Sequence, residues 1–158
     1  VVGAMLYPVC GGLARRYDAG RVLAVGMLIN LGAFVVMSVM WVLSEFFHIP
    51  GGHVVGPFAL LVVAIGYPFD YVGGTMLAAE LTPNGEGSAM GLFNSAVAGG
   101  AIVGAVVPSF LARYFGYGSL PVLAALVMGA ALFVGADVLN PAGRRRGGPH
   151  RARPPVAP

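Results

Sequence analysis

The feature that most constrains this chain is a series of long apolar runs: Val22 to Ser44, Val54 to Ala79, Ser88 to Ala112 and Leu120 to about Ala136. A helix rises about 1.5 Å per residue, so roughly 20 residues cross a hydrocarbon core of about 30 Å. The last run is shorter, and we expect its polar end or slight bilayer thinning to complete the crossing. No run alternates with a period of two residues, which disfavours a β-barrel. The sequence predicts an all-α, polytopic transmembrane helix bundle.

Composition points the same way. The chain has 158 residues, of which 58% are hydrophobic and 9% are charged, whereas a soluble domain carries roughly a quarter charged residues. The single cysteine, Cys10, excludes an intramolecular disulfide and a Cys-based metal cluster. Neither GxxxxGK[ST], HExxH nor GxSxG occurs. We therefore expect no enzyme, no metal site and no cofactor.

The arginines predict the orientation. Arg15, Arg16 and Arg21 precede the first complete run, and five more follow the last run, from Arg144 to Arg153. Four crossings separate the two clusters, so both lie on one side, which the positive-inside rule makes cytoplasmic. Arg113 is the one exception. Because the basic residues flank apolar runs rather than cover a folded face, nucleic acid is not an expected partner.

Two regions follow from this pattern. Residues 1–140 are the predicted bundle, and residues 141–158, rich in Pro, Gly and Arg, are a predicted disordered, basic cytoplasmic tail. We favour a topology-fixing role for the tail over binding to lipid headgroups. Val1 to Leu13 are interpreted as the remnant of a helix that begins upstream, so we expect the chain to be a fragment of a longer protein.

Asp70 is the leading candidate functional residue. A carboxylate inside a spanning helix costs about 2.5–3.5 kcal/mol on insertion scales, so it should face protein or a watery cavity. Tyr67, Asp70, Tyr71 and Gly74 have the spacing of one helical face, and Pro68 should bend the helix there. This face suits a polyhydroxylated solute or proton exchange. The alternative is that Asp70 pairs with a donor on a missing helix and only stabilises assembly.

Other candidates are polar or small. Asn94 and Asn30 could each hydrogen-bond a solute or another helix, and we favour the interhelical role for both while keeping Asn94 as a candidate on the solute pathway. A face of small residues in the third run predicts close helix packing; it consists of Gly91, Ser95, Gly99, Gly100 and Gly104.

One segment, Gly11 to Arg21 (GGLARRYDAGR), resembles the cytoplasmic loop between the second and third helices of a six-helix repeat in the major facilitator superfamily. Arg15 stands where that pattern has an aspartate, and two extra residues precede Gly20. The resemblance implies a loop motif formed by Gly12, Arg15, Arg16, Asp18, Gly20 and Arg21.

A second resemblance narrows the family. Leu77 to Pro83 with Gly87 to Asn94 is similar to the segment joining the tenth and eleventh helices of the sucrose-proton symporters and related glycoside-pentoside-hexuronide transporters. Phe115 to Pro121 resembles the external turn before their twelfth helix. This implies a partial major-facilitator fold, from the end of helix eight to helix twelve, whose N-terminal transmembrane half is missing.

The resemblance also implies a function. The whole protein would be a secondary active transporter that moves a small solute, expected to be a sugar, by proton symport and alternating access. Asp70 would line the C-terminal wall of its cavity, with Tyr67 and Tyr71 beside it. The alternative is a non-transporting multi-pass membrane protein that acts in helix-helix assembly or as an adaptor.

Overall fold

The computed structural model describes residues 2–48, 52–82 and 86–139, and within them every regular element is a helix. The helices are α1 (Val2–Tyr17), α2 (Ala19–Phe47), α3 (Gly52–Leu81), α4 (Glu86–Phe115) and α5 (Ser119–Leu139). The last four are long and apolar enough to cross a membrane, which confirms the predicted spans. Each is slightly longer than the run that predicts it. The predicted tail, residues 141–158, lies outside the described residues.

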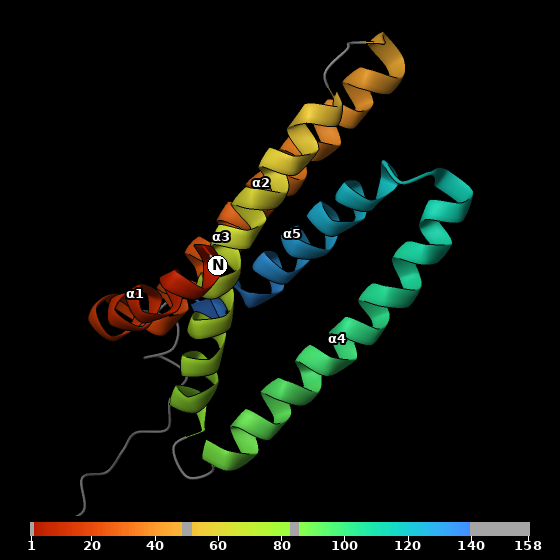
Figure 1. Cartoon of the computed structure of the whole chain (residues 1–158). Helices are drawn as coiled ribbons and strands as arrows, with labels where there is room; N and C mark the ends of the chain where they lie inside the picture. The colour runs from red at the N-terminus through yellow and green to blue at the C-terminus, as the bar shows by residue number, and fades with distance from the viewer. Residues whose placement is uncertain (1, 49–51, 83–85, 140–158) are drawn as a thin grey trace, which may run out of the picture.

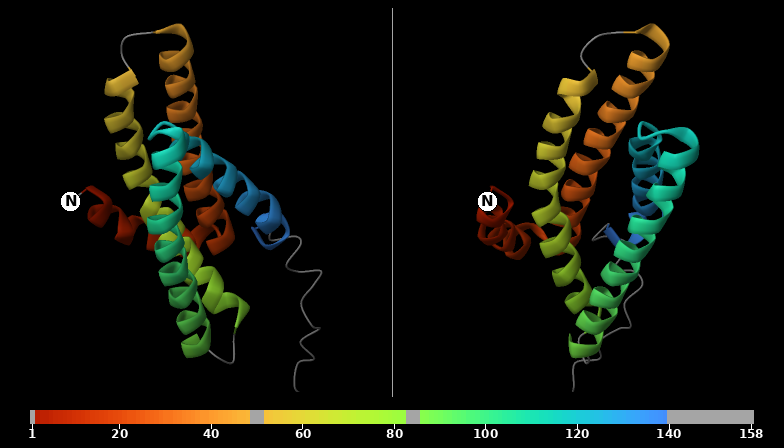
Figure 2. Two further views of the ribbon diagram at one scale, coloured as in Figure 1. Left: turned by 90° about the vertical axis from the view of Figure 1, so that its right-hand side faces the viewer. Right: turned by 45° about the vertical axis from the view of Figure 1, so that its right-hand side comes forward.

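The centre of the fold is a hairpin of α2 and α3, which lie side by side along most of their lengths (Figures 1 and 2). Leu23 of α2 lies against Gly73 of α3, and Asn30 lies against Gly66, so the two helices run antiparallel. α5 returns to pack on α2, and α1 packs mainly on α3. α4 contacts α3 and α5 but is exposed along almost all of its length.

The turn between α4 and α5 approaches α2 closely because of two glycines. Gly116 has φ 77°, a left-handed conformation that a residue with a Cβ adopts reluctantly. At Gly118 an added Cβ would overlap the indole ring of Trp41 on α2. The absence of both side chains lets α5 begin next to the hairpin.

The junction of α1 and α2 differs from the prediction. α1 continues to Tyr17, only Asp18 is non-helical, and α2 begins at Ala19. The Asp18 carboxylate accepts hydrogen bonds from the backbone N–H of Gly20 (2.9 Å) and of Arg21 (3.4 Å), which caps α2 at its first turn. The prediction of a loop over Gly11 to Arg21 is therefore wrong except at Asp18, because one capping residue replaces the loop.

Pro68 lies inside α3 and is fully buried. Figure 1 shows that α3 changes direction part-way along its length. A proline removes one backbone hydrogen bond and clashes with the preceding turn, which is the usual cause of such a bend.

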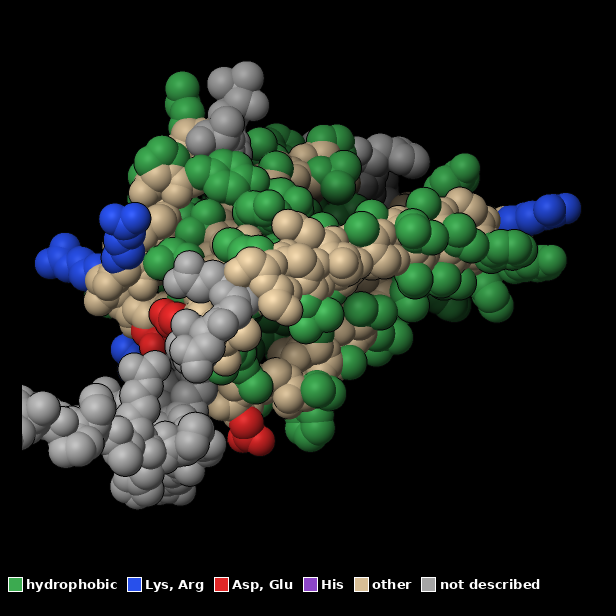
Figure 3. All heavy atoms as spheres, turned by 90° about the horizontal axis from the view of Figure 1, so that it is seen from below, with side chains coloured by type: hydrophobic (Ala, Val, Ile, Leu, Met, Phe, Trp, Pro, Cys, Tyr) green, Lys and Arg blue, Asp and Glu red, His purple; other side chains and the backbone are tan. Residues whose placement is uncertain are grey.

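The described surface is overwhelmingly apolar. Figure 3 shows hydrophobic side chains across the face that it views, with the arginines at its edges. Phe133 is 85% exposed, Val134 81% and Leu92 74%. In water such a surface would be an aggregation hazard, whereas lipid tails or further helices cover it without cost.

Candidate site at the α2–α3 hairpin

One polar contact joins α2 and α3 near the middle of the hairpin. The side-chain amide of Asn30 donates a hydrogen bond to Oδ2 of Asp70, with an N–O distance of 2.6 Å. Asn30 is only 4% exposed, and Asp70 is partly buried. The interhelical role favoured for Asn30 is confirmed. The partner of Asp70 lies on α2, a helix of this chain, rather than on a missing helix.

Two glycines make room for this contact. Gly26 precedes Asn30 by four residues on α2, and Gly66 precedes Asp70 by four residues on α3. An added Cβ at Gly26 would collide with Oδ1 of Asp70, and one at Gly66 would collide with Oδ1 of Asn30. Each polar side chain therefore lies on the glycine of the opposite helix. We call Gly26, Asn30, Gly66 and Asp70 the polar clasp.

The clasp leaves two oxygens without a donor. Oδ1 of Asn30 and Oδ1 of Asp70 are buried and accept no hydrogen bond from the described residues. A buried acceptor without a partner costs about 1–3 kcal/mol, and more when it carries charge. The Asp70 carboxyl group therefore has one oxygen bonded to Asn30 and one oxygen without a donor among the described residues.

A cluster of aromatic rings lies on the neighbouring face of α3. Tyr71 contacts Tyr7 of α1 edge to face, with ring centroids 6.2 Å apart, and Phe93 of α4 at 5.9 Å. Tyr67 stacks with Tyr71 at 6.3 Å. Tyr67 is 53% exposed and Tyr71 36%. Three helices thus bring four rings together, and all three tyrosines among them are at least partly exposed.

The predicted polar face of α3 divides between two neighbours. Asp70 points toward α2, whereas Tyr71 contacts α1 and α4, and Gly74 lies against Phe93. Successive helical residues differ by about 100° in direction, so Asp70 and Tyr71 diverge although they are adjacent. The acid and the rings are therefore neighbours on α3 that face different helices.

The remaining candidates lie on α4 and at the α1–α2 junction. Asn94 is exposed, and so are the five small residues of the predicted packing face: Gly91, Ser95, Gly99, Gly100 and Gly104. A Cβ added at any of the four glycines would meet nothing within 4 Å. Packing of this face on another helix stays a prediction. Arg15, Arg16 and Arg21 are exposed around the α1–α2 junction.

Sequence reasoning missed the packing glycines of the hairpin and Tyr7. Gly26, Gly66 and Gly73 pack closely on the opposite helix of the hairpin, whereas the sequence predicts close packing only for the small residues of α4. The signal was present, because a glycine precedes each of Asn30 and Asp70 by four residues. That spacing places each glycine on the same helical face as its polar residue, one turn away.

Comparisons with known proteins do not assign this chain to a family. No family model, curated protein or solved structure matches this chain. Within residues 2–48, 52–82 and 86–139, no group of three or more His, Cys, Asp or Glu residues could hold a metal ion.

Proposed function

We propose that this chain is part of a secondary active carrier that moves a small solute, a sugar, together with a proton. The observation that carries the proposal is Asp70, an acid in the middle of an apolar hairpin whose buried Oδ1 has no donor within the described part of the chain. Ionisable groups inside spanning helices are commonly functional, because they are expensive to keep there. The resemblance of Leu77 to Pro83 and Gly87 to Asn94 to proton-coupled glycoside carriers supports this reading.

The aromatic cluster supports a sugar as the solute. Tyrosine rings offer a flat apolar face and a hydroxyl group, which together suit a molecule that is apolar on its ring faces and polar at its edges. Tyr67 and Tyr71 are partly exposed, one residue or one turn from Asp70. The proposed roles are therefore proton binding at Asp70 and solute contact at the two tyrosines, with Asn94 as a further polar contact.

The test is Asp70→Asn in the full-length protein. An amide oxygen still accepts the hydrogen bond from Asn30, so the hairpin and the surface expression should be retained, but the side chain can no longer bind and release a proton. We expect proton-driven uptake of radiolabelled sugar to fall at least tenfold. Asp137→Asn, at the exposed end of α5, is the matched control and should leave uptake unchanged. Normal uptake by Asp70→Asn would remove Asp70 from the transport site.

A second function is favoured by the Asn30–Asp70 hydrogen bond and by the exposed face of small residues on α4. If the Asn30–Asp70 contact only joins helices, and the small residues of α4 pack on a partner, the protein is a non-transporting assembly factor or adaptor. This reading predicts that Gly99→Leu weakens association of the protein in membranes about tenfold, measured by energy transfer between labelled copies or partners. The carrier reading predicts no change in association from Asp70→Asn.

A further inference from the structure

We propose that a groove between α1, α2 and α3, at the end of the bundle assigned to the cytoplasm by the arginines, binds an anionic phospholipid. One acyl chain would lie in the groove, and the phosphate headgroup would lie at Arg21 and Arg16. This site is separate from the polar clasp, and the inference does not depend on the transport proposal.

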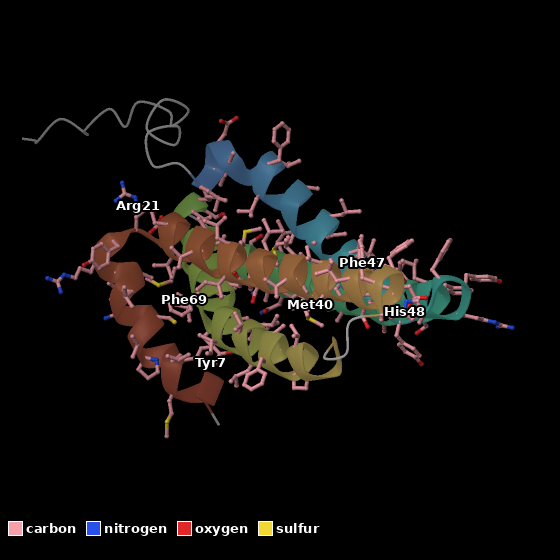
Figure 4. All side chains as sticks on the ribbon, turned by 90° about the horizontal axis from the view of Figure 1, so that it is seen from above. Tyr7, Arg21, Met40, Phe47, His48 and Phe69 are labelled. Atoms are coloured by element: carbon pink, nitrogen blue, oxygen red, sulfur yellow. The ribbon has the colours of Figure 1, made fainter. Side chains whose placement is uncertain are left out.

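The groove has a volume of about 330 Å³ and an apolar interior. α1 contributes Leu13 and Tyr17, α2 contributes Arg21, Val22 and Val25, and α3 contributes Phe69. Figure 4 shows Phe69 directed from α3 toward α1, and Arg21 at the corner where α1 meets α2. The interior of the groove is apolar and its edge carries a cation. The interior therefore suits the hydrocarbon tail of a lipid, and the edge suits its charged headgroup.

The single-residue junction at Asp18 creates the basic rim. Because Asp18 alone separates the two helices, the last turn of α1 with Arg15 and Arg16 lies next to the first turn of α2 with Arg21. The Arg16 guanidinium lies 5.9 Å from the centroid of the Tyr17 ring, and Tyr17 lines the groove.

Charge selects the lipid class. Arg21 is the only charged side chain among the described lining residues. The nearby Asp18 carboxylate is engaged with the backbone N–H groups of Gly20 and Arg21. A zwitterionic lipid would bring its own cation to this rim, and free phosphate would leave the apolar groove unused. Basic pockets between helices on the cytoplasmic side are the general form of anionic-lipid sites.

The experiment compares lipids that differ only in headgroup. The full-length protein, purified in detergent, is titrated with phosphatidylglycerol or with phosphatidylcholine of the same acyl chains, and bound lipid is counted by native mass spectrometry. We expect phosphatidylglycerol to be retained and phosphatidylcholine to be lost. Loss of one arginine near a membrane surface weakens binding of anionic lipid about fivefold, so we expect Arg16→Gln with Arg21→Gln to weaken it more than tenfold.

Two further variants separate the headgroup from the tail. Val25 is 47% exposed, so Val25→Phe should fold, fill the groove and reduce retention of phosphatidylglycerol with the arginines intact. Arg113→Gln, at the opposite end of the bundle, is the charge control and should bind normally. Equal retention of both lipids, equal loss in the Arg113 control, competition by inorganic phosphate alone, or full retention in Val25→Phe would each overturn the proposal. Full retention in Val25→Phe would mean that the lipid does not occupy the groove, as is expected if another helix of the protein fills it.

Discussion

Replacing Gly26 or Gly66 by alanine is expected to destabilise the α2–α3 hairpin by about 1–3 kcal/mol, the usual cost of overpacking a tight contact. A Cβ at Gly26 would also lie 2.8 Å from the backbone nitrogen of Asp70, and one at Gly66 would lie 2.8 Å from Cγ of Asn30. Backbone atoms of α3 cannot move aside alone, so the helices would have to separate. The Asn30–Asp70 hydrogen bond would then lengthen or break.

The chain offers a control on each helix. Gly32 on α2 and Gly56 on α3 have nothing within 4 Å of an added Cβ, so Gly32→Ala and Gly56→Ala should leave stability nearly unchanged or slightly raised. Equilibrium unfolding of the purified protein in mixed micelles of mild and denaturing detergent measures the difference. If all four variants unfold alike, the two glycines do not hold the helices together.

The spans were predictable because lipid imposes a simple rule. Any helix that crosses the core must be long and apolar, so hydropathy alone locates it, as it did for α2 to α5. The α1–α2 junction was not predictable in the same way. Its single non-helical residue depends on where the Asp18 carboxylate meets the first N–H groups of α2, which is a matter of backbone geometry rather than composition.

The two polar residues of the clasp were predictable from the sequence, but their pairing and the glycines beneath them were not. Asp70 was identified because an acid in an apolar run is costly, and Asn30 was identified as an interhelical residue. Their pairing depends on the register of α3 along α2, which close packing at Gly26, Gly66 and Gly73 specifies. The same register turns Asp70 toward α2 and leaves Tyr71 to α1 and α4. The spacing of residues along α3 shows which of them share a helical face, but it does not show which neighbouring helix each of them contacts.

Loss of the Asn30–Asp70 hydrogen bond is expected to destabilise the contact between α2 and α3. Asn30→Ala removes the amide that donates to Asp70 while leaving the acid in place, so we expect a loss of about 1–3 kcal/mol in stability. Asp70→Ala removes the costly acid itself and should destabilise less. The double variant should lose less than the sum of the single losses, by about 0.6 kcal/mol, the average for hydrogen bonds between membrane helices, and by no more than about 1.7 kcal/mol. The same unfolding measurement in mixed micelles gives all three values.

Asn94→Ala, on the exposed face of α4, is the matched amide control and should change stability little. Exact additivity of Asn30→Ala and Asp70→Ala would show that the bond contributes no coupling, and that glycine packing alone joins α2 to α3. Coupling of the expected size would show that the Asn30–Asp70 hydrogen bond itself helps to join α2 to α3.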